Sequence, residues 1–132
     1  MRRTISLTLV PLMLVACSDS RELSEAEGGK DGMVLVGPDR TGLLAGIRGT
    51  IDTTHGCVTL AGSEGGLVLP FGTTWDEERQ VVVLPDGREL SDGDPVSGGG
   101  GFTPLSTPSL RAAAIECGWS ATADTAWLQT ID

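Results

Sequence analysis

The stretch Val81-Val82-Val83-Leu84-Pro85-Asp86-Gly87-Arg88-Glu89-Leu90 contains the pattern that decides the fold class. Its first four residues are apolar, and such a short run before a turn signal predicts a central β-strand. Residues 85–87 predict a tight turn, because proline presets φ and glycine accepts the left-handed conformation that many turns need. Residues 88–90 then return as another strand. The stretch therefore indicates a domain built from short strands that reverse at tight turns.

Short apolar runs separated by turns continue on both sides of this stretch. Residues 44–52 alternate, with Ile47, Gly49 and Ile51 on one face and polar side chains on the other, which is the period of a half-buried strand. Further strands are expected at 33–36, 57–61, 67–69, 96–102 and 126–131. Six or seven short strands within roughly a hundred residues are typical of a small barrel or a rolled sheet.

The run of four glycines at 98–101 allows two interpretations. It could be a flexible linker, because glycine-rich segments behave as flexible coils. The alternation of Val96, Gly98, Gly100 and Phe102 favours a strand instead, since glycines inside strands mark bulges or barrel corners. We therefore predict a strand that bends at the glycines.

One helix is predicted late in the chain, over residues 108–117. Thr107 is a suitable N-cap, Pro108 fits the first helical turn, and Gly118 is a C-terminal stop. Its apolar face is made by Leu110, Ala113, Ala114 and Cys117. The predicted fold class is mainly β, a small β-barrel or rolled antiparallel sheet with one late helix.

Length and charge limit the possible functions. The chain has 132 residues, with 9 basic and 18 acidic side chains and a net charge of -9. This length suits one domain. An acidic chain lacks the basic footprint that nucleic acids require, so no nucleic-acid partner is expected. The 19 glycines are about twice the usual share of roughly 7%, which again favours turns over long helices.

The first residues read as an export signal. Arg2 and Arg3 precede an eleven-residue apolar stretch that is too short to span a bilayer. The sequence Leu14-Val15-Ala16-Cys17 follows, and it resembles the lipobox of bacterial lipoproteins. The resemblance implies cleavage before Cys17, a diacylglycerol on its thiol, and attachment to the cell membrane with the protein facing the extracytoplasmic side. Two alternatives are an ordinary signal peptide with a chance cysteine and a small transmembrane anchor.

These signals divide the chain into three segments. Residues 1–16 are the predicted signal peptide, and 17–31 are the lipidated cysteine and an acidic flexible tether. Residues 32–132 are the predicted β-rich domain. A short helix over 22–27 is the alternative within the tether. The mature chain would carry 7 basic and 18 acidic side chains, a charge of -11 that anionic lipid headgroups repel. The acyl chains alone would therefore hold the protein at the membrane.

Cys57 and Cys117 remain once Cys17 is lipidated. Two cysteines in an exported domain predict a disulfide bond, and two buried free thiols are the alternative. His55 lies two residues before Cys57, but a cysteine in a disulfide cannot act as a nucleophile, so we expect His55 in an exposed turn. Residues 61–65 approximate a nucleophile elbow, yet they lack its first glycine and a following helix.

The sequence predicts no catalytic residue, no metal ligand set and no cofactor. The acidic clusters at 76–78 and 92–94 could contribute oxygens to Ca²⁺, but neither completes a calcium loop. Trp75, Asp76 and Glu77 are the candidate contacts for a protein or glycan partner or a ligand, because an exposed tryptophan in a loop is a common contact. A tryptophan in the core is the alternative.

The segment from Gly56 to Gly101 resembles small uncharacterised lipoproteins of actinobacteria. The shared features are Gly-Cys-Val at 56–58, LPFGTTW at 69–75, LPDGR at 84–88 and GDPVSGGG at 93–100, with a cysteine near the end. The resemblance implies a location and a fold but no reaction. We therefore expect a membrane-anchored, non-enzymatic binding or envelope-support module. The alternative is a lipoprotein that binds a small ligand or a metal ion.

Overall fold

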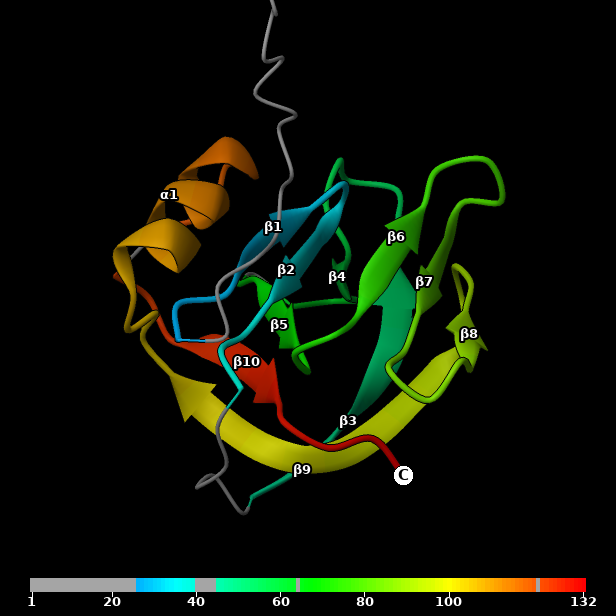
Figure 1. The fold of residues 1–132 in the computed structure, drawn as a ribbon. Helices are drawn as coiled ribbons and strands as arrows, with labels where there is room; N and C mark the ends of the chain where they lie inside the picture. Colours follow the sequence, from blue (N-terminus) through cyan, green and yellow to red (C-terminus); the bar gives the residue numbers. More distant parts are fainter. Residues whose placement is uncertain (1–25, 40–44, 64, 121) are drawn as a thin grey trace, which may run out of the picture.

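The structure is a computed structural model that describes residues 26–39, 45–63, 65–120 and 122–132. This part of the chain is mainly β, with one helix (Figure 1). The strands are β1 (Gly29–Asp31), β2 (Val34–Val36), β3 (Ala45–Asp52), β4 (Thr59–Leu60), β5 (Leu67–Leu69), β6 (Thr74–Asp76), β7 (Val81–Val83), β8 (Glu89–Leu90), β9 (Pro95–Thr103) and β10 (Thr125–Leu128), and the helix is α1 (Pro108–Glu116).

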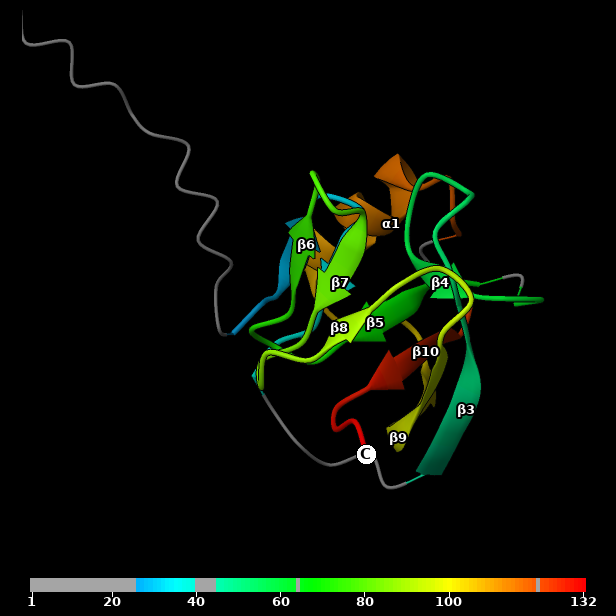
Figure 2. The same ribbon diagram turned by 90° about the vertical axis from the view of Figure 1, so that its right-hand side faces the viewer.

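Two sheets make up the domain. Seven strands form a rolled sheet in the order β1-β2-β5-β10-β9-β3-β4, and β6, β7 and β8 form a smaller antiparallel sheet. Strand β9 curves along the bottom of Figure 1, its partner β3 rises behind it, and Figure 2 shows the same roll from the side. The described strands do not close into a barrel, because β1 and β4 each pair with a single neighbour. The expected rolled sheet with one late helix is confirmed, whereas its closed-barrel variant is wrong.

The rolled sheet is mixed, which differs from the antiparallel sheet predicted. Strand β5 runs parallel to both of its neighbours, β2 and β10. Parallel strands require cover on both faces. Every residue of these three strands is buried, so each reads as a continuous apolar or near-apolar run. The centre of the sheet is therefore these three strands, while Val81–Val83 is the middle strand of the smaller sheet.

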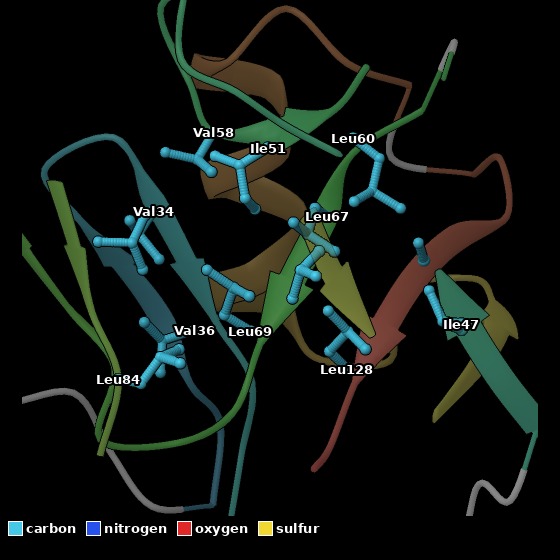
Figure 3. Close-up of a cluster of buried hydrophobic side chains, with 13 residues drawn as sticks. Val34, Val36, Ile47, Ile51, Val58, Leu60, Leu67, Leu69, Leu84 and Leu128 are labelled. Carbon is cyan, nitrogen blue, oxygen red and sulfur yellow. The ribbon is translucent and has the colours of Figure 1, made fainter. Parts of the chain in front are cut away.

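Alternate residues of the central strands enter two separate cores, because successive side chains of a strand point to opposite faces. The first core lies between the two sheets, and Figure 3 shows side chains from different strands converging on it. It includes Val34, Val36, Leu67, Leu69, Val82, Leu84 and Leu128. The second core lies under α1 and includes Leu35, Val68, Leu110 and Trp127. The helix and the smaller sheet thus cover opposite faces of the rolled sheet.

Helix α1 begins and ends as the sequence predicts. The side chain of Thr107 accepts a hydrogen bond from the backbone N–H of Leu110 at 3.3 Å, which satisfies one of the free donors at the helix start. The chain leaves the helix through Gly118, whose φ of 77° suits glycine. Leu110, Ala113 and Ala114 are buried beneath the helix, as their spacing indicates.

The folded region starts earlier than the predicted boundary at residue 32. Gly29–Asp31, which the sequence places in the tether, forms strand β1 and pairs with β2. A two-residue turn at Gly32-Met33 joins the strands, with φ of 57° at Gly32. The side-chain hydroxyl of Ser109 donates to the carbonyl of Gly28 at 3.1 Å, which holds the incoming chain against α1. Polar composition hid this strand, because its stability comes from these long-range contacts.

The four glycines lie within β9, so the strand interpretation is confirmed over the linker. Residues 129–132 leave β10 and run along the β9 backbone, where Gln129 donates to the Gly99 carbonyl at 2.9 Å. A Cβ at Gly98 would overlap the main chain of the segment that follows β10, and a Cβ at Gly100 would overlap the main chain of β10 at Trp127. Glycine is needed there because two backbones touch. The predicted last strand, 126–131, is accordingly shorter and ends at Leu128.

Candidate ligand-binding site

Cys57 and Cys117 form the predicted disulfide bond. Their sulfur atoms are 2.08 Å apart and their Cα atoms 5.8 Å apart, within the usual range for a disulfide. The bond joins the loop before β4 to the C-cap of α1. The pair therefore ties the helix to the loop that leads into β4. Cys17 and the other lipobox residues lie outside the described residues.

His55 lies in an exposed turn, as predicted. Its Nε2 atom is 3.2 Å from Oδ2 of Asp52, and 71% of its side chain is exposed. Ser63 is also exposed and lies in a turn after β4, where its N–H donates to the carbonyl of Leu60 at 3.1 Å. The described residues around both side chains form turns between strands.

The Trp75-Asp76-Glu77 group is placed differently from the exposed loop expected. Trp75 and Asp76 belong to β6, and the Trp75 ring is half-buried against the first core. The indole Nε1–H donates to Oε2 of Glu77 at 2.6 Å. The Asp76 carboxylate accepts the N–H of Arg79 at 3.0 Å. Each polar group thus has a partner within the domain, and a partner contact through these residues stays a prediction.

The acidic turns use their carboxylates to bind backbone N–H groups. Asp92 accepts from Thr53 at 2.8 Å, and Asp94 accepts from Ser91 at 2.7 Å. Within the described residues no three His, Cys, Asp or Glu side chains are grouped so that they could hold a metal ion. The described acids therefore act as acceptors that stabilise the turns between strands.

A pocket of about 350 Å³ opens where β3, β8 and β9 meet the segment after β10. Figures 1 and 2 both show the C-terminal segment beside β9 at this end of the roll. Apolar side chains of Leu90, Val96 and Ile131 form one part of its lining, and polar side chains of Arg48, Arg88, Ser97 and Asp132 form another. This volume lies near the lower end of the range of about 300–1,000 Å³ for small-molecule sites.

Arg88 is held in place at the pocket. Its Nε donates to Oδ2 of Asp86 at 2.6 Å, and an Nη2–H donates to the carbonyl of Ile131 at 3.0 Å. The Arg88 backbone N–H, followed by its side chain, lowers the pKa of Asp86, so this carboxylate stays charged. A guanidinium held by several acceptors presents a fixed positive edge to the pocket.

Arg48 differs from the other described basic residues. Lys30, Arg79 and Arg88 form ion pairs, and Arg111 donates to a backbone carbonyl. The Arg48 side chain has no hydrogen bond or ion pair with the rest of the described chain. Residue 48 pairs with Ser97 on the antiparallel neighbour, so their side chains lie on the same face of the sheet.

Sequence reasoning placed Arg48 on the polar face of its strand but did not connect it with Arg88. These residues are 40 positions apart, and both line the pocket because the chain after β10 lies alongside β9 and bonds to Arg88. Two sequence features could have pointed to this site: the run of glycines at 98–101 and the small number of basic residues. Neither feature predicts that the chain after β10 continues alongside β9, which is a tertiary contact.

Comparison of the chain with protein-family models, curated proteins and solved structures gives no match. The described residues contain no helix that is both long and apolar enough to cross a membrane. The functional conclusion therefore depends on the residues and geometry given above.

Proposed function

We propose that this protein is exported, lipidated on Cys17 and held at the cell membrane, where its β domain serves as a non-enzymatic binding or envelope-support module on the extracytoplasmic side. The observation that carries the proposal is the Cys57–Cys117 disulfide. Such bonds persist in oxidising compartments and are rare in the cytoplasm. A lipobox at 14–17 ahead of a domain with a disulfide is the combination expected of an exported lipoprotein.

The positions of β1 and of the pocket in the rolled sheet support a tethered module. The first described residues lead directly into β1 at one edge of the rolled sheet, with Thr107 and Ser109 bonded to the carbonyls of Glu27 and Gly28. The pocket lies toward the other part of the sheet, at β3 and β9. A ligand that enters the pocket would therefore approach away from the point where the chain joins the anchor.

A second candidate is favoured by the pocket itself. A depression with both apolar and charged walls suits a small ligand better than the flat contact of an envelope-support role. The protein would then be a small-ligand-binding lipoprotein, with Arg48 and Arg88 as the polar contacts.

Metabolic labelling with a palmitate analogue tests the anchor. We expect the wild-type protein to carry the label in the membrane fraction and Cys17→Ala to lose it, because the thiol is the acylation site. The matched control replaces both Cys57 and Cys117 with Ser, which leaves Cys17 intact and should keep the label. Labelling that survives in Cys17→Ala contradicts the proposal.

A further inference from the structure

We propose that the pocket bounded by β3, β8, β9 and the segment after β10 binds a small monocarboxylate with a short apolar body, and that Arg48 supplies the main charged contact. This inference rests on the proposed role as a binding module and names the ligand class of its pocket. The polar lining fixes the head of such a ligand, and the apolar lining receives its tail.

The first reason is the unpartnered cation. The protein carries a net charge of -9, so carboxylate acceptors are abundant. Each of the other described basic side chains pairs with a carboxylate or a backbone carbonyl. Arg48 instead lines the pocket with no hydrogen bond or ion pair among the described residues. Its guanidinium keeps donors in the fork geometry that matches a carboxylate.

The second reason is the apolar part of the lining. Leu90 and Ile131 are half-buried and pack on the first core, to which the buried Val96 belongs. Side chains held by the core give a fixed apolar surface with little ordering cost on binding. An alkyl tail of a few carbons would replace water on this surface.

The charges around the pocket favour a monoanion over a phosphate. Asp86 already binds Arg88, and Asp132 lines the same pocket beside Ser97. These carboxylates repel a doubly charged phosphate more strongly than a singly charged carboxylate. The net negative charge of the whole protein adds to this repulsion. Arg88 therefore helps to hold the site together, and Arg48 remains available for one carboxylate.

The test is an NMR titration of the full chain in lipid nanodiscs with pentanoate, 1-pentanol and inorganic phosphate. Backbone amide shifts at Leu90 and Ser97 report the pocket. We expect saturable shifts with pentanoate, with about tenfold weaker binding in Arg48→Gln and an intermediate effect in Arg48→Lys, which keeps the charge without the fork. Lys30→Gln is the matched control, since it removes one positive charge on β1, and its affinity should equal that of wild type.

Three results would overturn the proposal. Pentanoate could leave Leu90 and Ser97 unshifted, it could bind Arg48→Gln as tightly as wild type, or 1-pentanol or phosphate could bind as tightly as pentanoate. An unchanged amide spectrum away from the pocket shows that each variant is folded. The labelling experiment measures acylation of Cys17, whereas the titration measures binding in the pocket. The two experiments therefore distinguish an error in the proposed anchor from an error in the proposed ligand.

Discussion

At the scale of single residues, much of the acidic charge stabilises turns. Asp52, Asp86, Asp92 and Asp94 each accept a backbone N–H from a residue in or beside a turn. An ionised carboxylate that accepts such a bond satisfies a donor that no strand can reach. The aspartates between the described strands therefore help to hold the turns in shape. From the sequence alone, they look like residues of a solvated surface.

Asp52 gives a prediction about pH. Hydrogen bonds from the Thr54 hydroxyl and N–H, and the nearby His55, lower the pKa of its carboxyl. We expect Thr54→Val to raise this pKa toward the ordinary aspartate value, because the larger of these causes is removed while the backbone bond remains. A side-chain carboxyl NMR titration measures the pKa directly.

The sign of the pH effect follows from the direction of this shift. A carboxyl with a lowered pKa stabilises the fold above its unfolded pKa, near 4 for aspartate, and loses that contribution as pH falls through the folded value. Thr54→Val should therefore reduce the loss of stability on acidification below about pH 4. The control is Asp86, whose pKa depends on Arg88 and should not move. An unchanged Asp52 pKa in Thr54→Val contradicts this assignment.

At the scale of elements, β9 is defined by the backbones that lie beside it. The strand has four consecutive glycines, yet it pairs with β10 on one side and with β3 on the other. The chain after β10 continues alongside the same strand in the same direction and bonds to Gly99. Glycine is weakly suited to strands in general, but here close backbone contact selects it. This contact also builds the pocket wall at Ile131.

Substituting Gly100 tests whether close contact with the β10 backbone requires glycine in β9. A Cβ there would overlap the carbonyl oxygen of Trp127, so Gly100→Ala must displace one backbone. We expect the free energy of unfolding to fall by about 2 kcal/mol or more, measured by urea denaturation.

The matched control is Gly46→Ala, on the neighbouring strand β3. A Cβ at Gly46 has no atom within 4 Å, so this variant should lie within about 0.5 kcal/mol of wild type. Equal stabilities of the two alanine variants would show that the backbone approach at β9 does not constrain the fold.

At the scale of the whole molecule, two cores share one sheet. The first core joins the rolled sheet to the smaller sheet, and the second joins it to α1. The disulfide connects α1 to the loop before β4, at the opposite edge of the sheet order from β1. The N–H of Val58 in the same loop donates to the carbonyl of Met33 in the β1–β2 turn at 2.7 Å, so the disulfide adds a covalent link to a loop that also bonds to this turn.

Reduction of this disulfide should lower global stability. Closing a loop with a sequence separation of 60 residues removes unfolded-state entropy worth about 4 kcal/mol in the chain-entropy estimate. That is a large part of the 5–15 kcal/mol typical of a domain. We expect the urea midpoint to fall on addition of dithiothreitol.

The control for this measurement replaces both Cys57 and Cys117 with Ser. This variant should start at the lower midpoint and should not respond to dithiothreitol. If wild type keeps its midpoint after mass spectrometry confirms reduction of the bond, the disulfide contributes nothing measurable to stability.

The sequence by itself determined the fold class, the helix limits and the cysteine pairing. These follow from local signals: the period of two in residues 44–52, the cap at Thr107, the stop at Gly118, and the two cysteines that remain if Cys17 is set aside as a lipobox residue. Local signals suffice where one residue's backbone preference or chemistry decides the outcome.

Tertiary structure alone decided the parallel pairing of β5, the early start at β1 and the pocket. Each depends on contacts between segments far apart in the chain, such as Ser109 with Gly28 or residues 129–132 with β9. Such contacts form where the packing of both cores leaves room, and no short stretch of sequence encodes them. The candidate site was hidden for this reason, because Arg48 and Arg88 line one pocket only once the chain after β10 lies alongside β9.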